Sequence, residues 1–408
     1  MRLPALLSRP ISPWLWQDVY RRSAMKFMHL GDMHLGKSLG DFDLYEDQRF
    51  MLDQILTLIQ KEGVEALLLA GDIYDRAIPP EGAVRNLDYF LRELAAAGVQ
   101  VYMISGNHDS DERLHFGSAL FAARGIFIGS KYEGRLQKQV ARDAFGDIHI
   151  YLLPFVKASQ VRHFFPEEEI ESYDDAIQAV VRHSDFDPAR RNILVAHQFV
   201  AGNRDPLLSG SESPGTQSVG LVEKISCESL AAFDYVALGH IHSPQRVGRK
   251  HIRYSGSILK YSLGEVHNDK RVPIITLEEK GKLTIEEFPL TPLRDLRHIK
   301  GPLKQLLDPI HVVSAGDFIY ATLTDEDMVQ DVMGIFQTVY PNTVKVDYEN
   351  SHTRAIENVD ITKGIGPKTF EELAEEFYRQ MYGSEMSAEE KEIMAWAAGK
   401  AGVADETH

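Results

Sequence analysis

The segment KFMHLGDMHLG, residues 26–36, sets the pattern on which the rest of the chain is built. A short apolar run ends at a glycine, and Asp32 and His34 follow it directly. A buried strand of a parallel sheet has this continuous apolar character, and ligands of open α/β sheets bind at the carboxyl ends of the strands. The segment therefore predicts a buried strand that delivers an aspartate and a histidine to one edge of a sheet.

Four further apolar runs, ALLLA, VYMIS, NILVA and YVALG, end in the same way. The polar residues that follow them are Asp72, Asn107 with His108, His197, and His240 with His242. Carboxylate, amide and imidazole donors without a thiolate suit Mn, Fe, Mg or Zn better than copper or a zinc-finger site. The pattern predicts a metalloenzyme whose ligands meet at the carboxyl ends of its strands.

Composition narrows the class of protein. The chain has 408 residues, enough for a sizeable core and two or more domains. It carries no apolar stretch long enough to cross a bilayer, so we expect no membrane partner. The single cysteine, Cys227, excludes an internal disulfide framework and favours a reducing, cytoplasmic location. A net charge of −16 argues against a wholly basic nucleic-acid-coating protein but leaves room for a local basic surface.

Strand and helix patterns alternate from residue 25 to about residue 270, which predicts a layered α/β domain. Within it we expect helices over residues 45–61 and 81–97, the second opened by a proline pair and closed near a glycine. Residues 1–24 are broken repeatedly by proline and lack the apolar core of a secretory signal. We expect them to be disordered or not native, with Met25 as the start.

A change of pattern at about residue 271 predicts a second domain over residues 271–350. It begins with a hairpin, RVPIITLEE and KLTIEEF, and continues as a small β-α-β unit around a helix at 326–340. Its role is either simple packing or a cap over the site. Residues 351–408 then carry two helical patterns, one over residues 368–381 and a second opened by a capping box at Ser387. These helices either fold back on the body or bind a partner.

One motif in the first ligand cluster points elsewhere. Residues 31–38 match the P-loop pattern G-x-x-x-x-G-K-[ST]. A P-loop, however, opens a helix directly after its lysine, whereas Leu-Gly-Asp-Phe-Asp follows Ser38. A carboxylate at Asp32 would repel phosphate, and a nucleotide site would leave the other clusters unexplained. We therefore reject a P-loop nucleotidase.

Together, D-x-H, G-D-x-x-D, G-N-H-D, a strand-end histidine and G-H-x-H, in this order, resemble the motifs of the calcineurin-like binuclear metallophosphoesterases. Within that superfamily the chain is similar to the SbcD-type nuclease subunits. The motifs span residues 25 to about 270, and the layout of the remaining domains extends the resemblance to most of the chain. It implies a layered β-sandwich flanked by helices, a small α+β cap domain and a C-terminal helical tail.

The resemblance also implies roles for individual residues. Asp32, His34 and His242 would hold one metal ion; Asn107, His197 and His240 would hold the other; Asp72 would bridge them. The expected cofactor is a pair of Mn²⁺ ions, with Mg²⁺, Fe or Zn²⁺ as alternatives. His108 would stabilise the transition state or protonate the leaving oxygen. Asp75 would orient a histidine or a metal-bound water.

The activity implied is Mn²⁺-dependent DNA exonuclease and hairpin-opening endonuclease cleavage in double-strand break and hairpin processing. The partner implied is an SbcC-like ATPase, whose coiled coil the helices of residues 351–408 would bind. The resemblance further implies a homodimer within a heterotetramer, formed through helices 45–61 and 81–97.

Basic residues follow the last ligand cluster without an intervening carboxylate: Arg246, Arg249, Lys250, Arg253 and Lys260. We expect them to place positive charge beside the site, along a DNA backbone, unless they form a solvated hairpin. Two competing functions stay open. One is another binuclear phosphoesterase, acting on phosphomonoesters, cyclic nucleotides or phosphoproteins. The other is a scaffold that uses its metals only for folding.

Overall fold

The structure, a computed structural model, describes residues 23–210, 212, 224–351, 374–375, 378–379 and 385–401. The expected extension at residues 1–24 and the expected helix at 368–381 lie almost entirely outside these ranges. The chain divides after Asp295 into two compact units.

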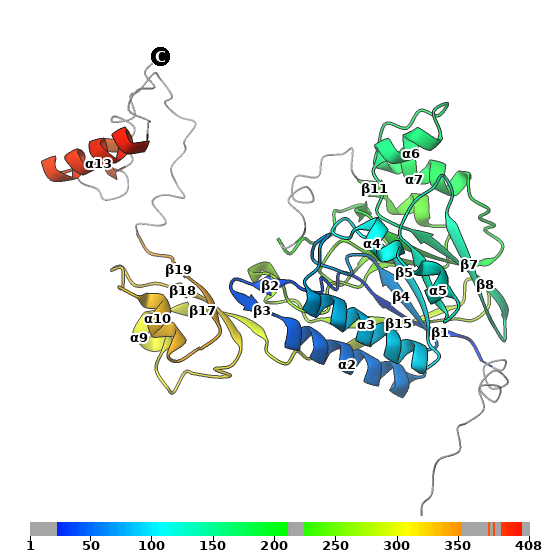
Figure 1. The fold of residues 1–408 in the computed structure, drawn as a ribbon, viewed down its shortest axis with the longest axis horizontal. Coiled ribbons are helices and arrows are strands. Elements are labelled where there is room, and N and C mark those ends of the chain that lie inside the picture. The colour runs from blue at the N-terminus through cyan, green and yellow to red at the C-terminus, as the bar shows by residue number, and fades with distance from the viewer. Residues whose placement is uncertain are drawn as a thin grey trace, which may run out of the picture. The chain divides into compact units, whose positions relative to one another are not determined.

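Two six-stranded sheets form the body of the first unit (Figure 1). In sheet order the first contains β16 (Leu283–Pro289), β15 (Arg271–Leu277), β1 (Lys26–Leu30), β4 (Ala66–Ala70), β5 (Gln100–Ile104) and β6 (Ile126–Gly129). The second contains β13 (Gln245–Val247), β14 (Arg249–Tyr254), β12 (Tyr235–Gly239), β9 (Arg191–His197), β8 (Gly146–Leu153) and β7 (Gln137–Asp143). The short strands β2 (Ser38–Leu39), β3 (Phe42–Asp43), β10 (Val200–Ala201) and β11 (Ile225–Ser226) form two small ribbons outside these sheets.

The inner faces of the sheets share one buried apolar cluster. Phe27, Leu68 and Tyr102 of the first sheet belong to the same cluster as Ile193 and Tyr235 of the second. Sheet packing of this kind makes a β-sandwich. All five predicted strands are present, which confirms the layered α/β fold class. One detail differs from expectation: the ligand clusters follow strands of two sheets, β1, β4 and β5 in one and β9 and β12 in the other.

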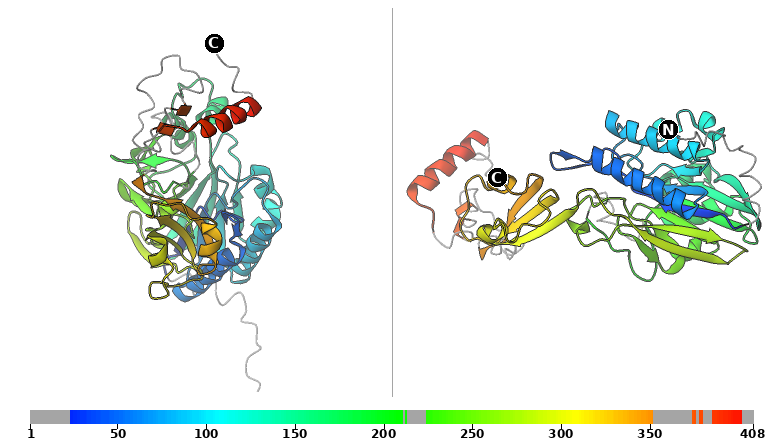
Figure 2. Two further views of the ribbon diagram at one scale, coloured as in Figure 1. Left: turned by 90° about the vertical axis from the view of Figure 1, so that its left-hand side faces the viewer. Right: turned by 90° about the horizontal axis from the view of Figure 1, so that it is seen from below.

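Helices α2 (Tyr45–Glu62) and α3 (Glu81–Ala96) match the two predicted helices. They lie together along one side of the sandwich (Figures 1 and 2). Helix α2 buries one apolar stripe, including Met51 and Ile55, and ends at Gly63 in the left-handed conformation. The other α-helices among the described residues of this unit are α4 (Asp111–His115), α5 (Ser118–Ala122), α6 (Ala158–Phe164) and α7 (Tyr173–Arg182). The last two pack against the apolar cluster on the outer face of the second sheet.

The hairpin expected to open the second domain belongs to the first unit. Strand β15 pairs antiparallel with β1, and β16 pairs with β15. A local hairpin on its own resembles the start of a new domain. In the folded chain, however, the apolar residues Val272, Ile274 and Ile275 are buried at the edge of the first sheet. The domain boundary expected near residue 270 therefore lies after Asp295.

The second unit contains the predicted β-α-β segment. Strands β17 (Leu296–Gly301), β18 (Phe318–Leu323) and β19 (Thr343–Tyr348) form a parallel sheet, accompanied by helices α9 (Leu303–Leu306) and α10 (Val332–Gln337). A small core of its own includes Ile319, Leu323 and Phe336. Helix α13 (Ala388–Ala401) begins at the predicted capping box, in which Ser387 and Glu390 bond reciprocally. Among the described helices, none is long and apolar enough to cross a membrane.

Candidate metal centre

The expected ligands stand on strained backbone. Six non-glycine residues of the described chain have positive φ, and four of them are Asp32, His34, Asp72 and His240. Side chains with a Cβ rarely adopt this conformation, and such residues concentrate at functional sites, where the surrounding structure enforces them. The sharp turns after β1, β4 and β12 therefore direct polar side chains into one place at a conformational cost.

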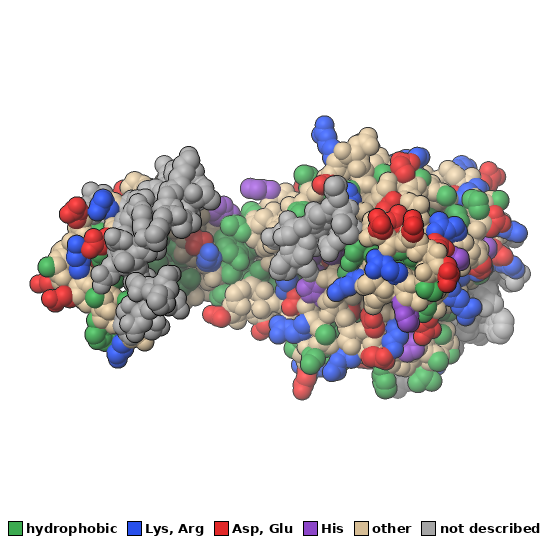
Figure 3. Space-filling model, turned by 90° about the horizontal axis from the view of Figure 1, so that it is seen from above, with side chains coloured by type: hydrophobic (Ala, Val, Ile, Leu, Met, Phe, Trp, Pro, Cys, Tyr) green, Lys and Arg blue, Asp and Glu red, His purple; other side chains and the backbone are tan. Residues whose placement is uncertain are grey.

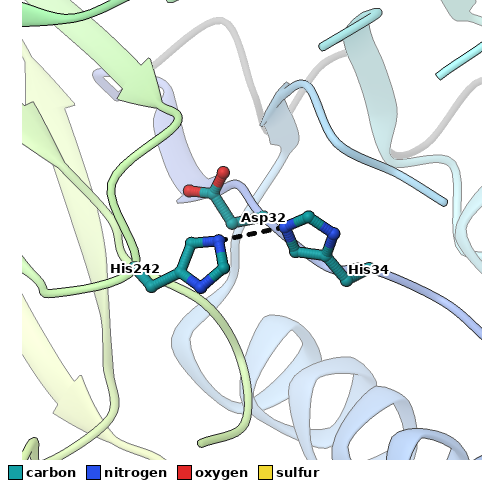
Figure 4. A group of neighbouring side chains, drawn as sticks. All are labelled: Asp32, His34 and His242. Atoms are coloured by element: carbon teal, nitrogen blue, oxygen red, sulfur yellow. Dashed lines mark hydrogen bonds between the residues drawn. The ribbon is translucent and has the colours of Figure 1, made fainter. Parts of the chain in front are cut away.

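The first ligand group combines residues that are far apart in the sequence of the sandwich domain. Nε2 of His34 lies 3.0 Å from Nε2 of His242, and the carboxylate of Asp32 stands beside the two rings (Figure 4). One donor atom from each of the three residues falls within 4.8 Å of the others. All three side chains are buried. The structure thus brings together the three residues expected to hold the first metal ion.

The second group gathers around the side-chain oxygen of Asn107. This Oδ1 atom lies 3.0 Å from Nε2 of His197 and 2.9 Å from Nδ1 of His240. The other ring nitrogen of His197, Nδ1, lies 2.7 Å from the carbonyl oxygen of Ala70. Nε2 of His197 and Nδ1 of His240 are therefore the ring atoms that face the Asn107 oxygen. The three residues expected to hold the second metal ion are also together.

Asp72 lies between the two groups. Its Oδ2 atom is 3.5 Å from Nε2 of His34 and 3.3 Å from Nε2 of His197. Its Oδ1 atom accepts a hydrogen bond from the backbone N–H of His108 at 2.9 Å. A carboxylate oxygen in contact with donors of both groups has the position that a bridging ligand requires.

Two glycines permit this crowding. A Cβ at Gly106 would lie 2.1 Å from Oδ1 of Asp72, and one at Gly239 would lie 1.9 Å from the carbonyl oxygen of Ala70. Real Cβ atoms do not approach other atoms so closely. The glycines that precede Asn107 and His240 are therefore required by the close approach of neighbouring strand ends, not by flexibility.

The residues present fit a pair of divalent cations. The buried Oδ2 atom of Asp32 has no hydrogen-bond partner among the described residues, although its Oδ1 accepts from the N–H of His240. A buried carboxylate oxygen without a partner is costly unless a cation meets it. Four imidazole nitrogens, one amide oxygen and two carboxylates form a donor set that suits Mn, Fe or Zn.

Charge in the metal-free site is arranged around Asp72. Burial alone would raise the pKa of its carboxyl, but His197 and His34 reverse this and hold the pKa well below the ordinary value. Burial would lower the pKa of His197, but the Asp72 carboxylate raises it to about 9. An imidazolium–carboxylate pair therefore exists near neutral pH, and a cation that binds here must displace a proton.

The other ligands respond mainly to burial. Burial raises the pKa of Asp32 to about 6, lowers that of His240 to about 3, and lowers that of His34 well below its usual range. Each shift disfavours the charged form of a group that has left water. His34 and His240 are thus neutral at physiological pH, the form in which imidazole donates to a metal.

His108 and Asp75 lie beside the first group. The His34 and His108 rings meet edge to face at 4.8 Å, and Nδ1 of His108 lies 2.8 Å from the carbonyl oxygen of Asp75. Nδ1–H therefore donates to this carbonyl, and Nε2 is the ring atom that can exchange a proton. The Asp75 carboxylate lies 3.6 Å from Nδ1 of His34 and accepts from Lys37 at 2.8 Å. The Asp75 carboxylate thus lies beside the ring of His34, one of the expected ligands.

Lys37, the lysine of the rejected P-loop motif, thus forms an ion pair with Asp75. The chain after Lys37 forms the short strand β2, and α2 begins only at Tyr45. No helix opens at the motif, as a P-loop would require.

Sequence reasoning missed Asp109, which fastens two ligand-bearing loops together. Its carboxylate accepts the backbone N–H groups of Ile73, Tyr74 and Gly106 at 2.9–3.0 Å. These amides belong to the loops after β4 and β5, which carry Asp72 and Asn107. Its place in the G-N-H-D motif was the available signal, but only the fold shows which amides it meets.

Two further residues hold the loop after β1 in place. Gln48 of α2 donates its side-chain N–H to the carbonyl oxygen of His34 at 2.8 Å. The hydroxyl of Tyr261 donates to the carbonyl oxygen of Met33 at 2.5 Å. Neither residue carries a sequence signal, because each acts through a bond to a backbone carbonyl, 14 positions away for Gln48 and 228 for Tyr261.

The basic residues after His242 do not gather beside the ligands. Strand β14 runs parallel to β12, so Arg249 and Lys250 begin it at the end of the sheet opposite His240. At about 3.3 Å per residue, Arg249 lies roughly 16 Å along the strand from Tyr254. The expectation of charge beside the site is wrong for these two residues because the chain turns back at the β13–β14 hairpin.

Three of the five basic side chains are paired with carboxylates: Arg249 with Glu228, Arg253 with Glu287, and Lys260 with Asp295. Arg246 is exposed on β13, opposite Arg253. On the face shown in Figure 3, basic and acidic side chains are interspersed, with no unbroken basic patch among the described residues. The local charge is therefore weaker than the sequence count predicts.

Comparison with family models gives two matches along the chain. Residues 25–244, more than half of the chain, match calcineurin-like phosphoesterase, and residues 292–382 match the type 5 capsule protein repressor C-terminal domain. The first match contains every proposed metal ligand. The second begins close to the division between the two units.

A relative from Staphylococcus epidermidis, the SbcD subunit of the nuclease SbcCD, is 32% identical over 371 residues, which cover 89% of this chain and 95% of the relative. Among solved structures, a dimetal phosphatase from Danio rerio aligns with a TM-score of 0.37 at 14% identity, over 66% of this chain and 99% of the other. A glutamine-dependent NAD⁺ synthetase from Acinetobacter baumannii aligns with a TM-score of 0.27 at 8% identity, over 93% of this chain and 72% of the other. Likenesses this weak have no bearing on function.

Proposed function

We infer the function of this chain from its family, because the chain belongs to the calcineurin-like phosphoesterases and, within them, to the SbcD subunits of SbcCD nucleases. It is a metal-dependent phosphodiesterase that works as the nuclease subunit of a complex with an SbcC-type ATPase. The observation that carries the chemistry is the position of Asp72 Oδ2, within 3.5 Å of a ligand histidine in each group. Two ions sharing this oxygen would be the working centre.

The positions of the donor atoms assign the proposed ligands to two ions. Asp32, His34 through Nε2 and His242 through Nε2 would hold one ion. Asn107, His197 through Nε2 and His240 through Nδ1 would hold the other, with Asp72 shared. Two bound divalent cations supply a hydroxide near neutral pH and neutralise charge on the phosphoryl group.

His108 is the residue that we assign to the leaving group. Hydrolysis of a phosphodiester leaves a ribose oxygen that needs a proton. With Nδ1–H donated to the Asp75 carbonyl, a protonated His108 carries its exchangeable proton on Nε2. Delivery of that proton lowers the barrier as general acid catalysis does. Asp75 holds the loop after β4 and the adjacent His34 ring in position for this step.

We propose Mn²⁺ as the working metal. Six-coordinate Mn²⁺ accepts mixed nitrogen and oxygen donors, whereas an all-oxygen set would favour Mg²⁺. Four histidines in the proposed ligand set support a metal that accepts imidazole nitrogen more readily than Mg²⁺ does. Fe and Zn²⁺ share this preference, so metal content of the purified protein and metal-dependent activity together decide the identity.

We propose linear and hairpin duplex DNA as the substrate, cut by exonuclease and endonuclease action. Of the five basic residues, Arg246, Arg253 and Lys260 retain a proposed role on the backbone path, whereas Arg249 and Lys250 sit at the far end of their strand. Preference of the purified protein for a small phosphomonoester over DNA would instead favour a phosphatase.

We propose that the C-terminal helices bind the coiled coil of the ATPase. Helix α13 exposes Ile393 and Trp396, at 67% and 65% of their surfaces. Apolar side chains on an exposed helix suit docking onto another helix. Co-purification of the ATPase with full-length chain, and its loss on removal of residues 365–408, is the expected result. Unchanged binding of the truncated chain would contradict the assignment.

We propose a homodimer, as part of a heterotetramer. Helices α2 and α3 expose Phe50 and Val84, but Phe116, at the end of α4, and Leu120, within α5, are more exposed, at 84% and 78%. Sedimentation of variants Phe50→Glu and Phe116→Glu separates the two surfaces. The variant that yields monomers identifies the interface, and a dimer that survives both changes contradicts both surfaces.

A further inference from the structure

A buried ion pair stands directly behind His242. Glu265 is fully buried, and Lys270 is 6% exposed. Their side chains are bonded to each other. Both lie in the segment between β14 and β15, which carries no ligand of the proposed metal pair. Metal ligation therefore does not explain why these two charged side chains are buried here.

The ammonium group of Lys270 donates three hydrogen bonds. It donates to the carbonyl oxygen of His242 at 3.0 Å, to the hydroxyl of Ser257 at 2.7 Å, and to the Glu265 carboxylate. An ammonium group has three donors, so each has a partner. The lysine thereby ties the backbone of a ligand residue to the carboxylate beside that residue's ring.

Glu265 faces the outer nitrogen of the His242 ring. Its Oε1 atom lies 3.5 Å from Nδ1 of His242, while Nε2 of the same ring lies 3.0 Å from Nε2 of His34. Glu265 is itself fixed by the N–H of Tyr261 at 3.1 Å and the hydroxyl of Ser257 at 2.9 Å. The carboxylate thus occupies a rigid position on the side of the ring away from the ligand group.

Stability alone does not account for such a pair. Burying two charges costs about as much as their attraction returns, and apolar residues of the same volume are often equally stable. His197 meets a backbone carbonyl, Ala70, at its outer nitrogen. A carboxylate in that position fixes the tautomer as a carbonyl does, and its negative charge also increases the electron density of the imidazole.

We propose that Glu265 is a positioning residue for His242, held in place by Lys270. The carboxylate keeps the proton of the ring on Nδ1 and points the lone pair of Nε2 at the first metal ion. Lys270 ties the carboxylate to the backbone carbonyl of His242. This assignment rests on the proposed function, because it takes His242 to be a metal ligand.

Titration of the full-length, metal-stripped protein with Mn²⁺, followed through the electron paramagnetic resonance of the free ion, measures the affinity of each site. Glu265→Gln keeps the size of the side chain but removes the charge. The double variant Glu265→Leu with Lys270→Met removes both charges and leaves no unpaired ion in the core. In each, we expect one of the two Mn²⁺ dissociation constants to rise about 10- to 100-fold.

The matched control is Asp143→Asn. Asp143 is paired with Arg191, and both side chains are buried. Arg191 begins strand β9, which His197 ends, so the pair lies about 20 Å from the ligands at about 3.3 Å per residue. We expect this variant to lose stability in thermal unfolding but to bind both ions as the wild type does. Equal weakening of Mn²⁺ binding in the control would overturn the proposal, because the effect would then be general.

The variant His242→Ala distinguishes a failure of the positioning role of Glu265 from a failure of the ligand assignment. If it loses one Mn²⁺ site while both Glu265 variants bind as the wild type does, the positioning role is wrong and the proposed function stands. If His242→Ala keeps both sites, the ligand assignment fails, and the positioning role fails with it.

Discussion

His34 and His242 are 208 positions apart in the chain, yet their Nε2 atoms lie 3.0 Å from each other. Histidine nitrogens bind a metal ion at about 2.0–2.1 Å, so two of them on one ion lie at most about 4.2 Å apart. The two rings therefore already have the spacing of adjacent ligands on a single ion. The strained turns at His34 and after β12 bring these two rings together from the two sheets.

Replacement of His108 by alanine should separate catalysis from metal binding. Because His108 is assigned to proton delivery and not to metal binding, the turnover number should fall about 10²- to 10⁴-fold. Mn²⁺ stoichiometry, measured by metal analysis of the dialysed protein, should stay at the wild-type value. A variant with unchanged turnover would remove His108 from the chemistry, and one that loses metal would make it a ligand.

Asp109→Asn should destabilise the metal-free protein. The carboxylate accepts three backbone N–H groups, and an amide would offer its single oxygen to them while turning a donor toward the rest. We expect the free energy of unfolding, from urea titration, to fall by about 1–3 kcal/mol. Glu112→Gln, an exposed neighbour, should change it by less than about 0.5 kcal/mol. Equal stability of the two variants would show that Asp109 does not fasten the loops.

Glu65 should make stability depend on pH. Burial, and then the nearby Asp143 carboxylate, raise the pKa of Glu65 to about 7 from 4.5. A raised carboxyl pKa contributes stability that is complete below 4.5 and is lost as pH rises through 7. Since the side chain is partly exposed, screening reduces the effect to about 1 kcal/mol.

The variant Glu65→Gln cannot ionise, so it should be more stable than the wild type at about pH 8 and equal to it at about pH 4. Thermal unfolding at the two pH values measures the difference. Glu167→Gln, on the surface, serves as the control and should show no such dependence. A constant difference between Glu65→Gln and the wild type at both pH values would contradict the raised pKa.

The ligand clusters can be recognised from the sequence because each is local: a strand of four or five apolar residues is followed by a donor, with a glycine between them at every strand end except that of His197. The same locality made the helices at α2 and α3 predictable within a residue. The hairpin of β15 and β16 was correctly expected, but its partner β1 lies about 245 residues earlier in the chain, and only the fold shows that pairing. Long-range pairing has no signature in the hairpin itself.

The same limit explains the other differences. Arg249 follows His242 closely in sequence but starts a strand at the opposite end of the sheet. Glu265 and Lys270 resemble ordinary charged residues until the fold buries them behind His242. A residue that acts through another residue's ring, as Glu265 does in our proposal, has no motif, because its position depends on where the chain returns.

Cleavage of end-labelled linear DNA by the purified protein, with and without Mn²⁺, tests the central claim most directly. Asp72→Ala is the matched variant, since its carboxylate is the shared contact of both ligand groups. We predict Mn²⁺-dependent cleavage by the wild type and none by the variant, because the two ions cannot assemble without their bridge. Cleavage by Asp72→Ala at the wild-type rate and with the same Mn²⁺ dependence would contradict a binuclear centre.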